Sequence, residues 1–174
     1  MPRTIEYYVA TSIDGFIAAE DGSYDMFTPD EEQLSLFLDR IRSAYDAVVM
    51  GRATFDVGRA QGVLDPYPWL DTHVVSSSLA AETVPNVTVH DRPAHAVVTD
   101  LRSGDGGAIW ICGGGVLAGS LLTAGLLDRV VLKRYPVTLG RGVPLFGTTV
   151  RRPLRLETST AYPSGVVVDE YAVG

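Results

Sequence analysis

The feature that most constrains this chain is the stretch 109–117, where an apolar run meets three consecutive glycines and a second apolar run follows. The first run is too short for a helix, whereas the second recurs at helical spacing, with apolar residues at Val116, Leu117, Leu121 and Leu122. We therefore predict a strand, a tight turn and a helix. Glycines at such a turn let the first N–H groups of the helix approach a phosphate, which the helix dipole favours. The alternative is that the glycines only allow close packing of strand on helix.

Standard nucleotide motifs match this turn only in part. Gly113, Gly115 and Ala118 satisfy G-x-G-x-x-G/A, but the dinucleotide fingerprint needs an acidic residue about twenty positions on. Lys133 and Arg134 stand there instead. The chain has no G-x-x-x-x-G-K-[ST] sequence, which excludes a P-loop. The turn is therefore predicted to bind phosphate outside the usual Rossmann frame.

A second glycine ends an earlier apolar run, 47–50, that we predict to be a buried strand. Gly51, Arg52 and Thr54 follow at the entrance of a short helix. Backbone donors at the helix start, a guanidinium and a hydroxyl together form a second predicted anion site. Two such turns on separate strands indicate a ligand with more than one phosphate. The alternative for Arg52 is a surface salt bridge.

Two further polar groups follow predicted strands. Three hydroxyls, those of Ser76, Ser77 and Ser78, come after the strand 72–75 and can bind a phosphate monoester without adding charge, although serine runs are also common in loops. Asp14 lies just past the first strand, at the end where ligands of α/β sheets gather, and it either serves a ligand or only caps the turn.

A helix is predicted after this first loop, with Thr28 as N-cap, Pro29 at the first position and Glu31 completing a capping box. Its apolar stripe predicts a core face made of Leu34, Phe37, Leu38, Ile41 and Tyr45. Asp25 and Asp30 flank the helix start. Either can supply a carboxylate to a pocket or remain solvated.

The order of the elements indicates the fold class. Helices interleave with strands early, including a helix near 94–101, and strands alone finish the chain at 129–135, 154–161 and 166–173. This pattern favours a single α/β domain over residues 1–174, with a mostly parallel sheet and antiparallel C-terminal strands.

The composition of the chain limits which classes of ligand and partner are expected. A formal charge of -7 disfavours nucleic acid or an anionic membrane, and we expect a small-molecule ligand instead. The single cysteine, Cys112, cannot form an internal disulfide and no signal peptide opens the chain, so a cytoplasmic location is expected. Three scattered histidines, His73, His90 and His95, lack metal-ligand spacing, and no metal is expected.

Five segments in this order resemble the dihydrofolate-reductase-like family: 11–18, 49–55, 75–78, 111–115 and 140–146. The resemblance is greatest to the reductase domain of bifunctional riboflavin-biosynthesis enzymes and its stand-alone bacterial relatives. It implies a three-layer α/β/α fold and an oxidoreductase that uses NADPH to reduce a small heterocyclic or carbonyl compound. The zinc-dependent deaminase half of the bifunctional enzymes has no counterpart here.

The resemblance also implies roles for single residues. Gly51, Arg52 and Thr54 would hold phosphate oxygens, and Ser76 and Ser77 the 2'-phosphate. The pyrophosphate would lie against Gly113, Gly114, Gly115, Val116 and Leu117. Ala10 and Ile17 would line the nicotinamide site. Asp14 would contact the substrate, because the loop that 12–15 resembles borders the substrate in riboflavin-type reductases. Asp25, Asp30 and Glu31 are not matched to the carboxylate that contacts the pterin in dihydrofolate reductases, which disfavours folate as the substrate.

Two expectations carry alternatives. The chain is expected to be an active reductase, and the alternative is a non-catalytic nucleotide-binding or regulatory module of the same fold. It is also expected to form a homodimer, since the apolar run 166–168 in the tail hairpin would leave side chains bare at a free sheet edge. Otherwise the hairpin completes the subunit's own sheet, with Val166 and Val168 inward and Asp169 and Tyr171 outward.

Overall fold

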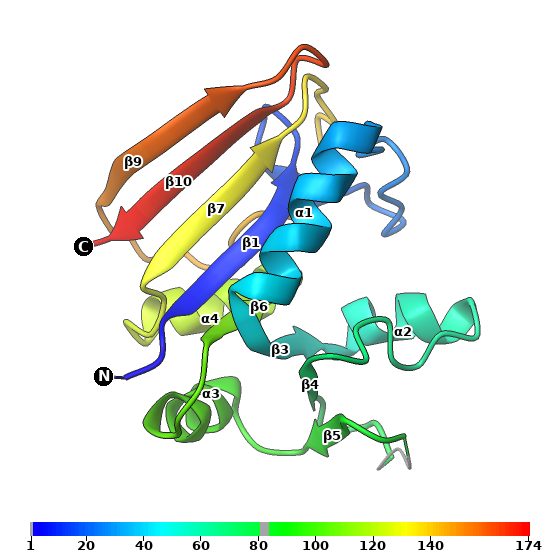
Figure 1. Ribbon diagram of the computed structural model, residues 1–174, viewed down its shortest axis with the longest axis vertical. Coiled ribbons are helices and arrows are strands. Elements are labelled where there is room, and N and C mark those ends of the chain that lie inside the picture. Colours follow the sequence, from blue (N-terminus) through cyan, green and yellow to red (C-terminus); the bar gives the residue numbers. More distant parts are fainter. Residues whose placement is uncertain (1, 81–83) are drawn as a thin grey trace.

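The computed structural model describes residues 2–80 and 84–174 (Figure 1). The strands are β1 (Ile5–Thr11), β2 (Phe16–Ala18), β3 (Tyr45–Gly51), β4 (Asp71–Val75), β5 (Val87–His90), β6 (Ala108–Ile111), β7 (Arg129–Arg134), β8 (Val143–Pro144), β9 (Leu154–Ala161) and β10 (Val167–Val173). The helices are α1 (Glu31–Ser43), α2 (Arg52–Ala60), α3 (Ala94–Ser103) and α4 (Gly115–Thr123).

One large sheet organises the described residues, in the strand order β5-β4-β3-β6-β1-β7-β10-β9. The strands from β5 to β7 are mutually parallel, whereas β10 is antiparallel to both β7 and β9. This confirms the predicted mostly parallel sheet with antiparallel C-terminal strands. Because the parallel strands share a direction, the loops that follow β1, β3, β4 and β6 meet at one edge. We call this the carboxyl edge.

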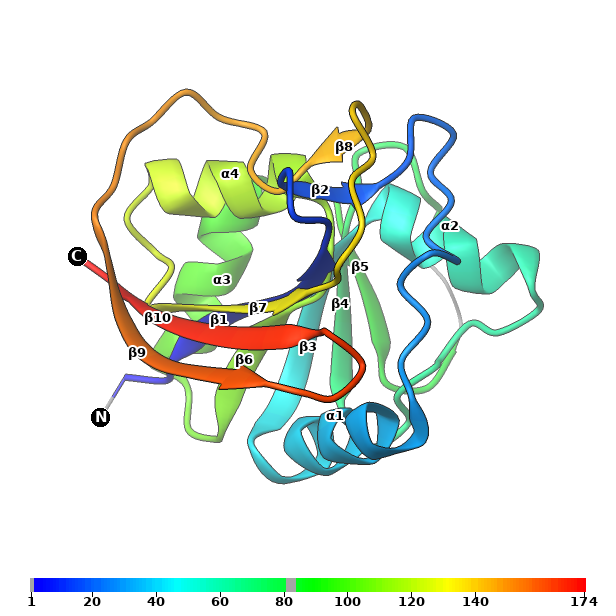
Figure 2. The same cartoon turned by 90° about the horizontal axis from the view of Figure 1, so that it is seen from above.

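Helices cover both faces of the sheet, as the three-layer prediction requires. On one face, α3 and α4 pack on Ile5, Tyr7 and Ile109 through apolar side chains such as Val98 and Leu121. On the other face, α1 and α2 contribute Ile41 and Phe55 to a cluster with Tyr8, Val48 and Trp110. Neighbouring residues of one strand point to opposite faces, so Tyr7 and Tyr8 belong to different cores. Figure 2 shows α1 on the side of the sheet opposite α3 and α4.

Helix α1 begins later than predicted, and the prediction of Thr28 as its N-cap was wrong. The cap is Asp30, whose carboxylate accepts a hydrogen bond of 2.8 Å from the Gln33 N–H. Thr28 instead donates its hydroxyl to the carbonyl of Asp25 at 2.6 Å. Both residue types cap helices well, and the chain turns helical only after Asp30, the nearer of the two.

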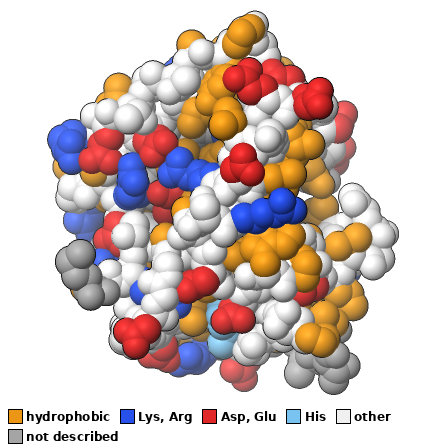
Figure 3. Space-filling view, in the orientation of Figure 1, with side chains coloured by type: hydrophobic (Ala, Val, Ile, Leu, Met, Phe, Trp, Pro, Cys, Tyr) orange, Lys and Arg blue, Asp and Glu red, His pale blue; other side chains and the backbone are white. Residues whose placement is uncertain are grey.

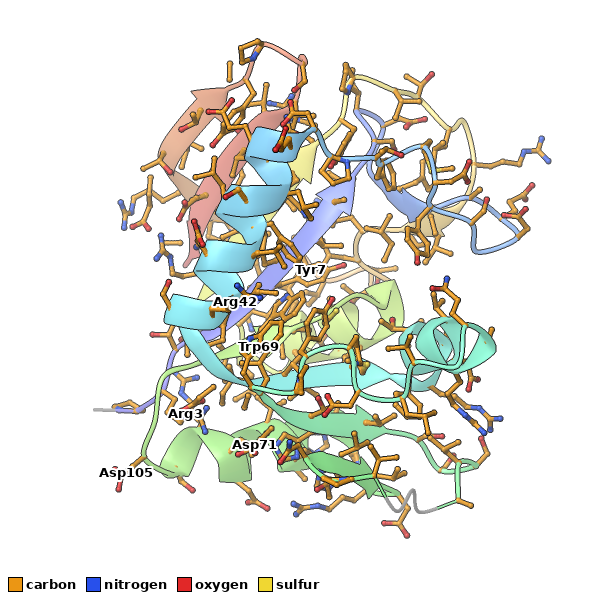
Figure 4. The ribbon with its side chains drawn as sticks, turned by 45° about the vertical axis from the view of Figure 1, so that its right-hand side comes forward. Arg3, Tyr7, Arg42, Trp69, Asp71 and Asp105 are labelled. Atoms are coloured by element: carbon orange, nitrogen blue, oxygen red, sulfur yellow. The ribbon has the colours of Figure 1, made fainter. Side chains whose placement is uncertain are left out.

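The predicted core stripe is confirmed at Phe37, Leu38, Ile41 and Tyr45 and is wrong at Leu34. Leu34 is 44% exposed, whereas Gln33 and Ile41 are buried and Phe37 is partly buried between them. These three residues recur every four positions, which defines one helix face. Figure 3 shows apolar side chains reaching the surface among charged ones on this side of the molecule. The helix is fixed at its end by Arg42, whose guanidinium lies 4.9 Å from the Trp69 ring centroid (Figure 4).

A small second sheet was not predicted. It pairs β2 with β8, matching Phe16 with Pro144 and Ala18 with Val143. Strands of three and two residues, one containing proline, leave no periodic pattern in the sequence. The pair lies beside the carboxyl edge, next to α4 in Figure 2.

The C-terminal hairpin completes the subunit's own sheet, as the alternative expected, because β10 pairs with both β7 and β9. Asp169 and Tyr171 do not point outward, however. Val166 is only 3% exposed, so the run 166–168 is not the bare surface. Asp169 is also 3% exposed rather than outward, because it accepts hydrogen bonds from Arg134 Nη2 (2.8 Å) and Ser159 Oγ (2.6 Å). Tyr171 likewise packs against the core under α3 and α4. The exposed apolar residues lie instead on the outer strand β9, at Leu154 and Leu156.

Candidate functional site

The glycine turn at the centre of the carboxyl edge has the predicted strand–turn–helix form. Gly113 and Gly114 adopt φ values of 66° and 82°, a region that glycine enters without strain. Helix α4 starts at Gly115, and its first internal hydrogen bond runs from the Ala118 N–H to the Gly114 carbonyl at 2.9 Å. The N–H groups of the three residues before Ala118 have no carbonyl within the helix to bind. They are the donors that an anion needs.

The glycine turn is also tightly enclosed, so the close-packing alternative holds as well. A Cβ at Gly113 would lie 3.0 Å from Thr54 Oγ1, and a Cβ at Gly115 would overlap the Pro144 carbonyl oxygen. The Gly147 N–H donates to the Gly115 carbonyl at 2.7 Å. The turn therefore lies between the start of α2 on one side and the segment 143–147 on the other.

The second predicted anion site lies at the start of α2. Gly51 is the N-cap and supplies no side chain, so the first N–H groups of this helix are also left without side-chain partners at the cap. Arg52 forms the surface ion pair that was its alternative role, with Nε 3.1 Å from Asp56 Oδ2. The same guanidinium donates from Nη1 to Ser78 Oγ at 2.7 Å. Arg52 thus joins α2 to the serine loop.

The serine loop divides its hydroxyls between two tasks. Ser76 is 7% exposed, and its Oγ accepts the N–H groups of Ser78 (3.3 Å) and Leu79 (3.1 Å). This hydroxyl therefore shapes the loop. Ser77 and Ser78 are exposed, and Ser78 is the one bonded to Arg52. Sequence reasoning assigned the phosphate to Ser76 and Ser77, and nothing in a run of identical residues distinguishes the third.

Asp14 anchors one loop to another. Its exposed carboxylate accepts the N–H groups of Leu139 (3.1 Å) and Gly140 (2.7 Å) from the segment after β7. A hydrogen bond from Ser12, together with those backbone donors, holds the pKa of Asp14 below its usual value. The group is therefore an anion at neutral pH and is no proton donor. Its predicted contact with substrate stays a prediction.

The residues predicted to line the nicotinamide site lie at the opposite end of the carboxyl edge from Ser78. Ala10, near the end of β1, packs against a cluster formed by Phe27, Tyr135 and Val166. Ile17 is half-buried in β2.

A groove of about 330 Å³ opens beside this cluster, between the start of α1 and the residues after β7. Its lining includes Asp30 and Gln33 from α1 and its cap, and Tyr135 and Val137 from beyond β7. Among the three acids considered for the substrate, Asp30 is the one that borders this groove. Asp25 is exposed and does not line it.

The sequence patterns gave no role to Lys133, which the structure places beside Ala10. Its Cα pairs with that of Ala10 across β1 and β7, and its Nζ lies 4.1 Å from the Phe37 ring centroid. Burial lowers the pKa of this amine to about 8. A signal was present in the sequence: thirteen arginines and this one lysine make up the 14 basic residues.

Metal sites and membrane-spanning helices were also considered for the residues that the structure describes. No three His, Cys, Asp or Glu side chains there are grouped so that they could share a metal ion. No helix of that part of the chain is long and apolar enough to cross a membrane. His73 and His90 contact each other at 3.0 Å, and burial lowers the pKa of both rings.

Comparison with known proteins places this geometry in a family. Residues 3–168 match the model of the RibD C-terminal domain. The uncharacterized protein YwjB of Bacillus subtilis is 30% identical over 167 residues, which cover 95% of this chain and 96% of YwjB.

Solved structures share the fold. A putative riboflavin biosynthesis protein from Shewanella sp. PV-4 has a TM-score of 0.84 and 25% identity, and the match covers 98% of this chain and 99% of that one. Dihydrofolate reductase from Enterococcus faecalis, complexed with NADP(H), has a TM-score of 0.69 at 17% identity, covering 98% and 96%. These matches confirm the predicted dihydrofolate-reductase-like fold.

Proposed function

The chain belongs to the RibD C-terminal domain family, and from that premise we propose that it is an NADPH-dependent reductase. Its substrate is a small heterocyclic or carbonyl compound, of the riboflavin-pathway pyrimidine or pterin type, and hydride is transferred to a C=N or C=O group. The observation that carries the proposal is the convergence of the glycine turn, Thr54, Arg52 and the serine loop along one edge of the sheet. Three segments far apart in sequence thereby offer phosphate-binding groups in one row.

The residues present fit such a cofactor. The starts of α2 and α4 offer free backbone donors, and the enclosed glycines leave no side chain between those donors and a bound pyrophosphate. Arg52 and Ser78 add a guanidinium and a hydroxyl at the end of the row where the resemblance places the 2'-phosphate. NADPH, when bound, supplies the hydride, and the protein has to hold it, orient it and exclude water.

Direct titration tests cofactor binding. We expect saturable NADPH binding, followed by cofactor fluorescence, at sub-millimolar concentration. Arg52→Ala should weaken it by about 1.5–3 kcal/mol, the scale of a lost charged hydrogen bond. Arg155→Ala is the matched control, because Arg155 is an arginine on β9 with a side chain 72% exposed and should leave affinity unchanged. Absence of saturable binding would reject the proposal.

Cofactor choice gives a second test at the serine loop. No acidic residue follows β4 to take a ribose 2'-hydroxyl, and exposed serines stand there instead, so NADPH should bind better than NADH. Ser78→Asp should reverse or abolish that preference, because a carboxylate repels a phosphate. Ser78 is a cleaner position than Ser76, whose hydroxyl holds the loop. Equal affinity of the unmodified protein for both cofactors would contradict this assignment.

Turnover is tested separately from binding. Single-turnover oxidation of bound NADPH is measured with a panel of pyrimidine, pterin, quinone and nitro compounds. Reduction of at least one compound is expected from a reductase. If NADPH binds and no compound is reduced, the chain is instead a nucleotide-binding or regulatory module of the same fold.

A further inference from the structure

Lys133 is the one lysine of a chain that otherwise uses arginine for its basic side chains. It lies on β7, between Ala10 of β1 and Val168 of β10 in the strand register. Its Nζ lies 4.1 Å from the Phe37 ring centroid and 5.1 Å from that of Tyr8. Within the described residues it forms no ion pair and no hydrogen bond. The amine is therefore held under α1 by aromatic rings alone.

No anion compensates this amine. The titratable groups that share its sheet face or pack on it are Tyr8 and Glu6 on β1, Arg129 on β7, Glu170 on β10, Arg40 on α1, Cys112 after β6 and Tyr135 after β7. The two carboxylates, Glu6 and Glu170, are paired with Arg40 and Arg129 rather than with the amine. Burial raises the pKa of Tyr8, Cys112 and Tyr135, with that of Cys112 reaching about 12, so all three are neutral at neutral pH. Arg40 is a cation and is itself bound to Glu6 and Glu170.

A purely structural role does not explain this arrangement. A partly buried amine without an anionic partner is unfavourable, and the ring contacts offset that cost only in part. A methionine would fill the same space with no charge to bury. An arginine would be a permanent cation, whereas lysine is the basic residue that can release a proton when buried. The single lysine of the chain thus stands at a position where its difference from arginine, the ability to release a proton, can matter.

The position of Lys133 points to the reacting end of the site. Its Cα partner, Ala10, is assigned to the nicotinamide site under the proposed function, and its neighbour Cys112 directly precedes the glycine turn. The groove beside α1 is lined from the same two sides, by Tyr135 two residues further along and by Gln33 one turn before Phe37. Gln33 is 5% exposed and its Oε1 has no hydrogen-bond partner. An unsatisfied buried acceptor beside a groove is a group that a bound ligand or water would satisfy.

We propose that Lys133 is a catalytic residue whose ammonium group donates a proton to the substrate atom that accepts charge during reduction. The inference rests on the proposed function. Hydride from the reduced nicotinamide bonds to the carbon of a C=N or C=O group, and the π electrons move to the nitrogen or oxygen. That atom takes the proton from Lys133. The oxidised cofactor leaves, and the neutral amine regains a proton from water.

The proposal defines a substrate class. The reducible bond must end in nitrogen or oxygen, as in an oxo- or imino-heterocycle, and a carbon–carbon double bond without such an atom is not a substrate. The lowered pKa of the amine, about 8, supports the role, because a general acid works best when its pKa lies near the working pH.

A lysine titration tests the role without turnover. Reductive methylation with ¹³C-formaldehyde labels only the N-terminal amine and Lys133, and Lys133→Met identifies the second resonance by removing it. The midpoint of the Lys133 resonance should lie well below that of an ordinary lysine. With NADP⁺ bound, an oxo-pyrimidine or oxo-pterin from the panel should move the midpoint, whereas a hydrocarbon of similar size should not. If no oxo-compound moves it, the proposal is overturned.

Single-turnover kinetics give a second test of the proposed role of Lys133. In single-turnover oxidation of bound NADPH, Lys133→Met should lose about 10²-fold or more in rate, the scale of a missing general acid. Its NADPH affinity should stay within about twofold of that of the unmodified protein, because Lys133 is not among the groups assigned to the cofactor phosphates. The unmodified rate should fall above about pH 8, and Lys133→Met should lack that fall. A variant that keeps both the rate and the pH profile overturns the proposal. Loss of NADPH binding in the unmodified protein would instead reject the proposed function itself.

Discussion

The carboxyl edge and the C-terminal hairpin belong to one sheet but are held together by different forces. Strands β1, β3 and β6 are covered on both faces, and most of their residues are buried. On β9, by contrast, all eight residues are exposed. The central strands depend on burial of apolar area, at about 25 cal/mol per Å², whereas the outer strand depends on backbone pairing and surface charge. The candidate site thus lies at the end of the most deeply buried strands.

The contacts that complete each region follow the same division. At the carboxyl edge, backbone meets backbone: Gly119 would place a Cβ 2.9 Å from the Gly147 carbonyl carbon, and Gly115 is as closely enclosed. On the hairpin, long side chains meet instead, with Arg129 bound to Glu157 and Glu170 at 3.0 Å. Backbone contacts cannot adapt to an added atom, whereas surface ion pairs contribute little individually. Substitutions should therefore lower the free energy of unfolding most at the carboxyl edge and least on the hairpin.

The largest effect is expected at the glycine turn. Gly115→Ala adds a methyl group that overlaps the Pro144 carbonyl oxygen. The carbonyl is part of the backbone, and the methyl carbon is bonded directly to the backbone, so no side-chain rotation can separate them. We expect a loss of about 3 kcal/mol in the free energy of unfolding, the upper range for overpacking, despite the better helix propensity of alanine. Urea denaturation followed by circular dichroism measures it.

Gly51→Ala is the matched control for that experiment. Gly51 also precedes a helix at a strand end, but it has φ of -82° and nothing within 4 Å of an added Cβ. Its substitution should change stability by no more than about 0.5 kcal/mol. Equal losses in the two variants would show that the segment 143–147 does not enclose the turn.

An intermediate effect, of opposite sign, is expected at Lys133, on the strand that joins the parallel and antiparallel parts. Its pKa falls from 10.5 to about 8 on folding, so the unfolded chain binds more protons between those values. The cost of the buried charge is fully present below about pH 8 and disappears as the pH rises towards 10.5. That cost corresponds to roughly 3 kcal/mol at pH 7. Because Lys133→Met also loses the two ring contacts of the ammonium group, it should stabilise the protein by about 2 kcal/mol.

The pH dependence distinguishes this explanation from better packing. The gain from Lys133→Met should shrink between pH 8 and pH 10, when urea midpoints of the two proteins are compared at each pH. A gain that stays constant over that range would mean that methionine simply packs better. A residue that weakens the fold at the pH where it would act is typical of a functional site.

The same contrast explains what the sequence could predict. Strands buried on both faces read as apolar runs, and the glycine turn follows one of them, so its place was predictable from 109–117 alone. The boundaries of β9 were also predicted as observed. The start of α1 was missed because two good capping residues, Thr28 and Asp30, lie two positions apart. Local pattern cannot choose between them.

The remaining misses concern pairings across long distances in sequence. Ser78 differs from its neighbours only through Arg52, 26 positions earlier. Asp169 reads as an outward strand residue until Arg134 is placed beside it. Asp14 was a candidate for the substrate, and its bonds to Leu139 and Gly140 depend on a loop about 125 positions away. Residue types indicated the chemistry of the site, but its partners required the fold.

The smallest effect on unfolding, and the largest on assembly, is expected on the hairpin. We propose that the chain forms a homodimer through β9, because this strand presents unpaired backbone groups at the sheet edge together with Leu154 (38% exposed) and Leu156 (52% exposed) on one face.

Leu156→Glu should change the free energy of unfolding of the subunit by only about 0.5 kcal/mol, since its side chain is already exposed. It should nevertheless convert a dimer mass to a monomer mass in light scattering after size exclusion at micromolar protein. Val63→Glu, at an apolar residue 42% exposed in the α2–β4 loop, controls for the added charge and should remain dimeric. A monomer mass for the unmodified protein would reject the dimer. The charged residues of β9, Arg155 and Glu157, would then be the groups that hinder pairing of this edge strand with another chain.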